Sequence, residues 1–273
     1  MRLNVSGRSM ILGLLLAALT AGTSTSWAIG FHFYPANISV EAKPGQVVNR
    51  KFTLGLSKDS EPAHFQARTE DWWRSPDNSE TFYAAPGTLR RSCAKWCSIN
   101  PVETGLKPGE KMVIKVSVAV PADAQPGGYW AALTVDQIRD PLAPKPHGIG
   151  MLFRGSVSVG IFVEVPNATR SAKITGIRVA GENVAVTLRN DGNTPLRVNT
   201  KFEFYRAGED KPAASVTFPG QPLLPEPTNT CEFSGPLPPV KDLPTGKYKV
   251  RVIVDTGLDY LMGAEKELDI TRQ

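Results

Sequence analysis

The residues of this chain that could carry chemistry are few and scattered. The cysteines are Cys93, Cys97 and Cys231, and the histidines are His32, His64 and His147. These side chains are too few and too far apart in the sequence to form a recognisable metal site. No serine stands in a Gly-x-Ser-x-Gly elbow, and no phosphate-binding Gly-x-x-x-x-Gly-Lys-Ser/Thr loop occurs. The sequence therefore predicts a protein that is not an enzyme and that uses no metal or other cofactor.

Cys93 and Cys97 are the one pair of cysteines that lie close together in the sequence. In an oxidising compartment two such thiols can close a small ring, which loop-closure entropy stabilises by about 2 kcal/mol before strain. The sequence predicts a disulfide between Cys93 and Cys97, with two free thiols as the alternative. Cys231 has no sequence neighbour to pair with, and we interpret it as a small apolar residue in a strand.

The N-terminal residues have the features of an export signal. A basic region with Arg2 and Arg8 precedes an apolar run at 10–21, which is too short to cross a bilayer. Small residues then occupy the −3 and −1 positions of a cleavage site that ends at Ala28. We predict a cleaved signal peptide at 1–28, a periplasmic or secreted protein, and no stable membrane span after cleavage. The alternative is an uncleaved N-terminal anchor.

The regular patterns in the rest of the chain have a period of two. In 155–165 the apolar residues at odd positions are Val157, Val159, Ile161, Val163 and Val165. A similar run covers 112–120, and turns rich in the 24 glycines and 23 prolines separate such runs. This alternation is typical of half-buried β-strands, and no stripe of period 3.6 occurs after residue 28. The sequence predicts an all-β fold.

The two halves of the chain carry similar signals. Pro-Gly-Gly-Tyr at 126–129 and Pro-Thr-Gly-Lys-Tyr at 244–248 each open a late strand. We therefore predict two related domains, at 29–166 and 167–273, because Pro166 ends the strongest strand. Basic and acidic side chains are nearly balanced in both halves, which argues against nucleic acid as a partner.

Residues 70–78 are rich in polar and aromatic side chains, and we interpret them as a loop. Adjacent strand residues point in opposite directions, so Trp72 and Trp73 cannot both face one core. One interpretation is a contact with a carbohydrate or a peptide, and a carbohydrate site would use Trp72, Trp73 and Tyr83. The other is that one of the two tryptophans caps the end of a sandwich core.

The stretch from Ser92 to Val135 carries a distinctive series of motifs. A tryptophan between two cysteines is followed by a proline, by Leu106-Lys107-Pro108-Gly109, by the alternating strand, and by Pro126-Gly127-Gly128-Tyr129. This series resembles the first domain of the periplasmic pilus-chaperone superfamily and of its relatives among bacterial secreted immunoglobulin-like proteins. The resemblance covers most of 37–165. It implies two immunoglobulin-like β-sandwich domains in tandem.

The resemblance also implies a function for the strand at 155–165, which follows a Pro-rich loop. In pilus chaperones of the usher pathway, the last strand of the first domain donates alternating apolar side chains to an incomplete subunit. The matching residues, with the basic residue that precedes them, are Arg154, Val157, Val159, Ile161 and Val163. Such chaperones also anchor the subunit's C-terminal carboxylate with basic residues in the interdomain cleft. This chain departs from that pattern, because no arginine opens its first strand, at 34–37.

The resemblance therefore implies a non-enzymatic, chaperone-like periplasmic protein that binds secreted or pilus/surface subunits by β-strand pairing. An alternative for the strand itself is that its apolar face only closes its own sandwich. Two alternatives for the whole protein are a structural or adhesive secreted surface protein and, on the aromatic residues at 72–83, a carbohydrate-binding module.

Overall fold

The structure is a computed structural model that describes residues 30–83, 85–139 and 154–271. Strand makes up 61% of the chain and helix 1%, so the predicted all-β fold is confirmed. The helical part is one 3-10 turn, η1 (Ala94–Trp96). The predicted signal peptide at 1–28 and the Pro-rich loop at 140–148 lie outside the described residues.

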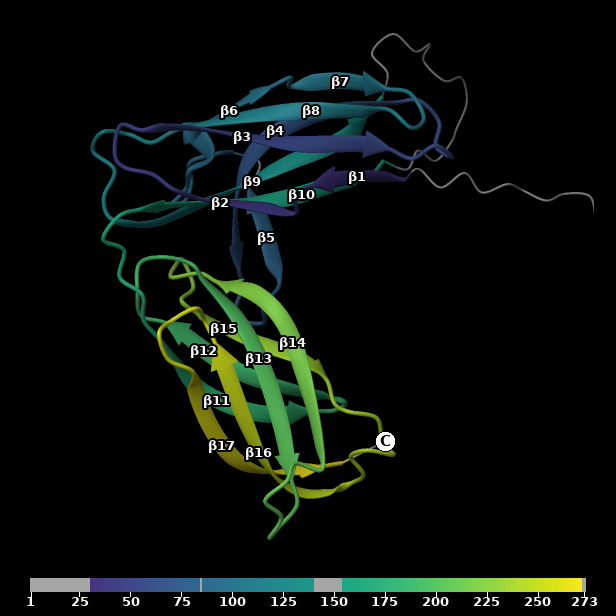
Figure 1. Ribbon diagram of the computed structural model, residues 1–273, viewed down its shortest axis with the longest axis vertical. Coiled ribbons are helices and arrows are strands. Elements are labelled where there is room, and N and C mark those ends of the chain that lie inside the picture. Colours follow the sequence, from purple (N-terminus) through teal and green to yellow (C-terminus); the bar gives the residue numbers. More distant parts are fainter. Residues whose placement is uncertain (1–29, 84, 140–153, 272–273) are drawn as a thin grey trace, which may run out of the picture.

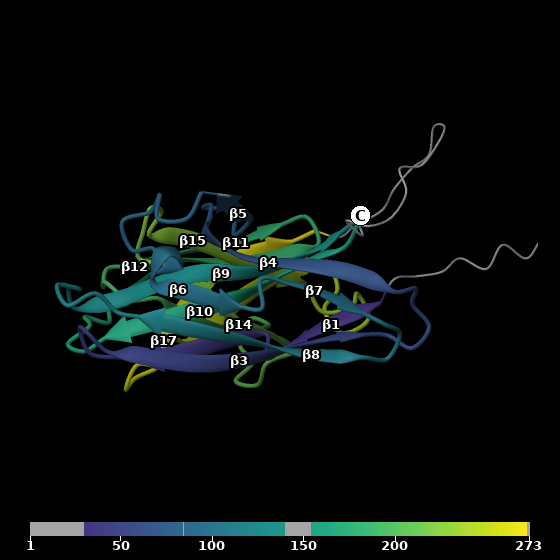
Figure 2. The same ribbon diagram turned by 90° about the horizontal axis from the view of Figure 1, so that it is seen from above.

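The first domain is a sandwich of two sheets (Figures 1 and 2). One sheet has the strand order β1-β3-β8-β6, and the other has the order β2-β10-β9-β4-β5, with β7 pairing to β4. The strands are β1 (Phe31–Tyr34), β2 (Asn37–Glu41), β3 (Val47–Leu56), β4 (Ala63–Arg74), β5 (Glu80–Tyr83), β6 (Cys97–Asn100), β7 (Glu103–Leu106), β8 (Lys111–Ala119), β9 (Gly127–Ile138) and β10 (Ser156–Val165).

The second domain is another sandwich, with sheets of order β11-β12-β15 and β14-β13-β16-β17. Its strands are β11 (Ala172–Ala180), β12 (Asn183–Asn190), β13 (Leu196–Tyr205), β14 (Ala214–Leu223), β15 (Thr230–Pro236), β16 (Gly246–Asp255) and β17 (Met262–Ile270). The two immunoglobulin-like sandwiches predicted from the sequence are thus present in tandem. The predicted boundary after residue 166 falls in the link between β10 and β11.

Alternation of side chains explains how the first core forms. Ile114, Val116 and Val118 of β8 are buried, whereas Lys115 between them is exposed and Ser117 is half-buried. Phe52 and Phe65 fill the space between the sheets and have almost no exposed surface. Burial of one such aliphatic or aromatic side chain stabilises the fold by about 1.5–3 kcal/mol, so each strand is held by its inward face.

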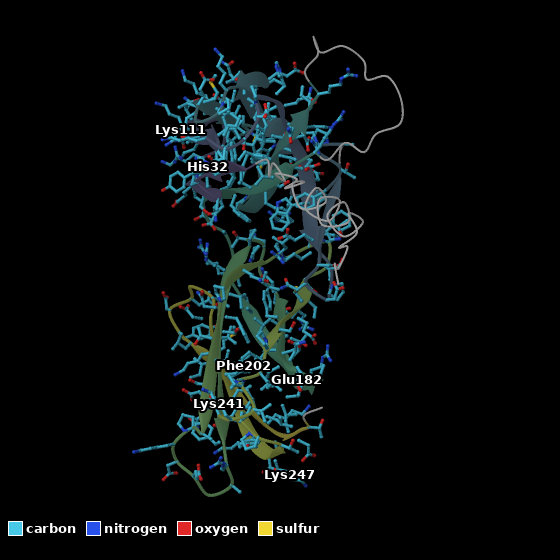
Figure 3. All side chains as sticks on the ribbon, turned by 90° about the vertical axis from the view of Figure 1, so that its right-hand side faces the viewer. His32, Lys111, Glu182, Phe202, Lys241 and Lys247 are labelled. Atoms are coloured by element: carbon cyan, nitrogen blue, oxygen red, sulfur yellow. The ribbon has the colours of Figure 1, made fainter. Side chains whose placement is uncertain are left out.

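The outer face of the β1-β3-β8-β6 sheet is mostly polar, with Val113 as an exposed apolar residue. Lys51 lies directly opposite Lys115, and His32 lies over Gly55, which has no side chain to obstruct it. Figure 3 shows His32 and Lys111 on the same side of this domain. This sheet therefore presents one face to the core and one to solvent, as the alternation at 112–120 predicts.

Strand β4 corrects one sequence prediction. Residues 70–78 are not all loop, because β4 continues to Arg74 and pairs there with β5. The acidic residues Glu70 and Asp71 obscured this strand, yet both are buried. Asp71 accepts hydrogen bonds from the backbone N–H groups of Gly87 (3.0 Å) and Leu89 (2.7 Å) and from the Ser92 hydroxyl. A buried carboxylate is tolerated when its hydrogen bonds are satisfied in this way.

The two sandwiches meet at a small apolar cluster. Trp72, Trp130 and Ala132 of the first domain pack with Leu224 of the second. The indole N–H of Trp130 donates to the backbone oxygen of Trp72 at 2.8 Å, which fixes the orientation of the Trp130 ring. The interface is therefore built around aromatic side chains that are buried on both sides, as in a domain core.

Polar contacts surround this cluster. The turn between β4 and β5 reaches the second domain, where the Glu232 N–H donates to the Pro76 oxygen at 2.8 Å. The Asn78 side chain bonds to Gln221, and Figure 1 shows β5 extending from the first sandwich toward the second. These bonds add to the apolar packing and hold the two domains in one relative orientation.

We predict that Leu224→Ala destabilises the protein by about 2–5 kcal/mol, because a buried leucine is replaced by a cavity between two tryptophans. Urea unfolding followed by tryptophan fluorescence measures this change. Val240→Ala is the control, since Val240 is 56% exposed, and it should change stability by less than about 0.5 kcal/mol. Equal effects of the two substitutions would contradict the buried interface.

Candidate functional site

Strand β10 has different neighbours along its two halves. On one side it pairs with β9 from Ser156 to Val165. On the other side it pairs with β2 in parallel, but only from Gly160 to Glu164. Among the residues that the structure describes, no strand pairs with 156–159 on that side. We call this segment the open edge.

The direction of the backbone groups in the open edge follows from two hydrogen bonds. The Gln137 N–H donates to the Gly155 oxygen at 2.8 Å, so odd residues of β10 direct their backbone groups toward β9. The Ala42 N–H donates to the Glu164 oxygen at 3.0 Å, so even residues direct theirs toward β2. Ser156 and Ser158 therefore present their backbone N–H and C=O groups to the open edge.

The apolar residues predicted to bind a partner lie on one face of β10, and this face belongs to the protein's own core. Val159, Ile161 and Val163 are 5%, 0% and 1% exposed and pack in the first sandwich. Val157 is half-buried and packs at the margin of the same core. In the free protein these side chains close their own domain, which is the alternative that the sequence left open.

Arg154 is exposed and precedes the open edge in the chain. The interdomain cleft contains another basic residue near β10, Arg170, but its guanidinium pairs with Glu164 at 2.5 Å. The Thr194 hydroxyl donates to the same carboxylate at 2.9 Å. The charge of Arg170 is thus neutralised by Glu164 of the same chain. Arg170 therefore does not replace the arginine that is absent at 34–37.

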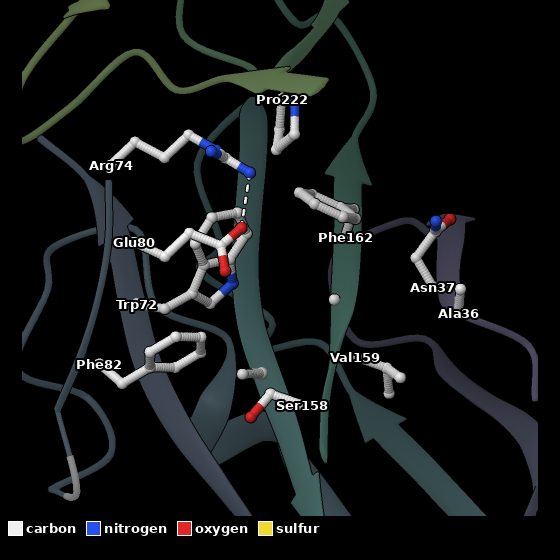
Figure 4. A pocket seen from close by; sticks show the side chains of 12 residues that line it. Ala36, Asn37, Trp72, Arg74, Glu80, Phe82, Ser158, Val159, Phe162 and Pro222 are labelled. Atoms are coloured by element: carbon white, nitrogen blue, oxygen red, sulfur yellow. Dashed lines mark hydrogen bonds and ion pairs between the residues drawn. The ribbon is translucent and has the colours of Figure 1, made fainter. Parts of the chain in front are cut away.

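The opposite face of β10 faces the interdomain region, where a hollow of about 200 Å³ opens. Its floor includes Ala132 and Gly160, which lie directly opposite each other in β9 and β10. Because neither has a side chain beyond a methyl group, the sheet surface is recessed at this point. Phe162 and Phe82 line the hollow from either side (Figure 4).

The tryptophans at 72 and 73 have separate roles. Trp72 is 5% exposed and contacts Phe162 edge-to-face, with ring centroids 6.0 Å apart. Trp73 is half-buried and packs against the same interdomain cluster. Trp72 therefore fills the interface between the domains, and the small part of it that stays exposed lies at the hollow, which leaves no open ring face on the outer surface for a sugar. Trp72 is thus buried between the domains rather than at the end of one sandwich core, and one of the aromatic residues proposed for carbohydrate binding is removed.

The three cysteines are thiols in the structure. Cys93 is buried and Cys97 half-buried, and the Cys97 thiol lies 3.3 Å from the Cys93 backbone oxygen. Burial raises the pKa of Cys93 well above its ordinary value. Cys231 lies against the β4–β5 turn, with its sulfur 3.2 Å from the Asn78 side-chain oxygen, and burial raises its pKa to about 11. Cys231 therefore lies in a strand, as interpreted, and belongs to the interdomain contact.

Two searches within the described residues give negative results. No group of three or more histidine, cysteine, aspartate or glutamate side chains there has the arrangement of a metal site. No helix in that part of the chain is long and apolar enough to cross a membrane.

Comparisons with known proteins find likeness in structure only. No protein-family model and no curated protein matches the chain. Similar solved structures include the class 5 fimbriae chaperone CfaA, with 13% identity, a TM-score of 0.47 and coverage of 87% of this chain and 99% of that one. The CupB2 chaperone of Pseudomonas aeruginosa has 12% identity and a TM-score of 0.46, with coverage of 87% and 100%.

The E. coli chaperone DraB is a further similar structure, with 15% identity, a TM-score of 0.41 and coverage of 89% of this chain and 98% of that one. These three solved structures are described as chaperones, and that of CfaA as a fimbriae chaperone. The likeness is one of strand arrangement.

We predict that Val159→Asp combined with Ile161→Asp unfolds the first domain. Both side chains are buried in its core, and an unpaired buried charge costs several kcal/mol. Thermal melting followed by circular dichroism measures the loss. A double variant that melts like the parent would show that this face is not held in its own core.

The disulfide between Cys93 and Cys97 remains a prediction. In protein taken from the periplasm we expect both residues to resist alkylation until a reductant is added, because the two side chains lie close together and the compartment is oxidising. Mass spectrometry of the alkylated protein decides this. Labelling of both thiols without reduction would contradict it, and Cys231 serves as the internal control for a thiol that burial protects.

Proposed function

We propose that this chain is a non-enzymatic, chaperone-like periplasmic protein that binds secreted or pilus/surface subunits by β-strand pairing at the open edge. The observation that carries the proposal is the outer side of Ser156–Val159, with which none of the described strands pairs, next to a segment of the same strand that is paired on both sides. An exposed edge of this kind is a template for one more strand, since it presents N–H and C=O groups at the spacing of a sheet.

The position of β1 supports the proposal. β1 pairs with β3 in the other sheet, and Phe31 of β1 contacts the backbone at Gly155, just before the open edge. Phe31 and Phe33 are half-buried and pack against the core from this margin. An added strand would therefore lie beside a margin of the sandwich that offers both backbone hydrogen bonds and apolar side chains.

The residues predicted from the sequence take different parts in this proposal. Val157 lies within the open edge and is half-buried, so its side chain is available to a partner's apolar residues. Arg154 is exposed at the start of the edge and supplies a positive charge to a partner's carboxylate. For Val159, Ile161 and Val163 to be donated, they would first have to leave their own core. Binding through the backbone of the open edge does not require that step.

A structural or adhesive surface protein is the second candidate. Its support is the buried contact between the sandwiches, which a spacer would also need. A spacer does not need a strand edge that is open for pairing, so the open edge favours the chaperone-like function.

Amide hydrogen exchange and a proline substitution test the proposal. In the free protein, the N–H groups of Ser156 and Ser158 should exchange rapidly and those of Val157 and Val159 slowly, because only the latter are bonded to β9. A synthetic extended peptide of alternating valine and threonine is the probe, and binding should protect Ser156 and Ser158. Ser156→Pro should weaken peptide binding about tenfold or more, because one hydrogen bond is lost and the ring blocks the edge.

Ser156→Ala is the matched control, since it removes the hydroxyl that bonds to Asp136 but keeps the backbone N–H. It should bind the peptide like the parent. If the peptide protects neither serine amide, or if the proline variant binds as tightly as the alanine variant, strand pairing at this edge is refuted.

A further inference from the structure

The hollow beside the open edge is lined by both aromatic and charged side chains. Ser158, Val159 and Gly160 of β10 form one wall, so the hollow adjoins the point where the open edge ends and pairing with β2 begins. Trp72, Phe82 and Phe162 supply aromatic surface around it. The polar side chains that line it include Arg74 and Glu80 (Figure 4).

Arg74 is only 9% exposed, and most of its guanidinium is already committed. Its Nη2 pairs with the Glu80 carboxylate at 2.6 Å, and its Nη1 donates to the backbone and side-chain oxygens of Asn78 at 2.9 and 2.8 Å. The guanidinium therefore holds the β4–β5 turn closed. The guanidinium is not available to bind an anion, because its charge is balanced by Glu80 on the same wall.

Two buried donors in this wall have no acceptor. The indole Nε1–H of Trp72 and the Nε–H of Arg74 are buried without a hydrogen-bond partner. Leaving a buried donor without a partner destabilises the folded protein, so an incoming acceptor that reaches either group removes this cost. Glu80 is the converse group: its side chain is 47% exposed, and only its Oε1 atom pairs with Arg74. It can accept a hydrogen bond from a ligand.

These groups match a carboxamide. Its carbonyl oxygen accepts from an unpartnered N–H, its NH₂ group donates to Glu80, and its planar body lies against the phenylalanine rings. A carboxylate has no donor for Glu80 and would carry a like charge toward it, so it fits poorly. A lysine or arginine side chain would leave the two buried donors unsatisfied and would face Arg74.

We propose that this hollow binds the carboxamide side chain of an asparagine or glutamine in the chain that pairs with the open edge. That a paired chain supplies the carboxamide rests on the proposed function. The preference of the hollow for a carboxamide over a carboxylate does not. A strand added along Ser156–Val159 brings its outward side chains over the same face of the sheet as Ser158 and Gly160. Side-chain recognition in the hollow then sets the register that backbone pairing alone leaves free.

The first experiment uses propionamide and propionate as probes of the full mature chain. In ¹H–¹⁵N spectra, propionamide should shift the Trp72 indole resonance and the Gly160 amide, and propionate should bind about tenfold more weakly, the effect of one hydrogen bond to a charged group. Glu80→Gln should reverse this order, because Arg74 then lacks its carboxylate. Glu267→Gln, on an exposed strand of the second domain, should leave both affinities unchanged.

Trp72→Phe keeps an aromatic ring but removes the donor, and it should weaken propionamide binding several-fold as read from the Gly160 amide. Spectra of residues distant from the hollow verify that each variant is folded. If propionate binds the parent as well as propionamide does, the hollow is an anion site and the proposal fails. If neither probe shifts these resonances, the hollow holds only water and the proposal also fails.

A pair of peptides separates this inference from the proposed function. Two extended valine–threonine peptides that differ only by a glutamine or a glutamate should bind the open edge with different affinities, the glutamine peptide more tightly. Equal affinities, with Ser156 and Ser158 protected in both, would refute a role of the hollow in strand recognition and leave strand pairing intact. Binding of propionamide with no peptide binding would refute strand pairing and leave the selectivity of the hollow intact.

Discussion

The backbone hydrogen bonds of β10 are shared unevenly along its length because the first strand of the chain changes sheets. β1 pairs with β3 up to Tyr34, and after two residues the chain resumes as β2, paired to β10 in the opposite sheet. A chain that crosses between layers cannot pair with both sheets at the crossing. The outer side of 156–159 is left without a strand among the described residues, and the margin of the sandwich is open there.

The second constraint is the contact between the domains. Trp72 and Trp130 are too large to lie on a solvent-facing sheet without cost, and Leu224 of the second domain covers them. Covering them brings the second sandwich over the outer face of β9 and β10. Where that face has only Ala132 and Gly160, the cover is incomplete and the hollow remains. The hollow thus follows from small residues placed beside large ones.

Much of the fold could be predicted because its strands follow simple periodicity. The alternation at 112–120 and 155–165 identified β8 and β10, since each has one buried and one outer face. β4 beyond residue 69 was missed, because Glu70 and Asp71 are polar by type but buried by hydrogen bonding. Their partners, such as Ser92 and Thr134, are distant in the sequence, and no local pattern reveals them.

The candidate site shows a sharper limit of sequence reasoning. The alternation in β10 correctly identified a face of valines and isoleucine. The same alternation is expected, however, whether this face packs in the core of its own domain or binds a partner. What distinguishes the two is the neighbour of each half of the strand, which depends on where β2 begins. Arg74 was equally hidden, because its nearness to β10 arises only when β4, β9 and β10 form one sheet.

In the proposed function, the open edge and the hollow would recognise different features of a partner strand. Backbone pairing along 156–159 accepts many sequences, because it uses groups that every residue except proline provides. Its register is weakly defined over so short a segment. A side-chain pocket at one end changes this, since a slip of one residue turns the recognised side chain to the other face of the strand. Glu80 and Arg74 neutralise each other on the wall of this pocket, so the recognition depends on hydrogen bonds rather than on charge. It would accordingly persist at high salt, where recognition by an exposed ion pair would weaken.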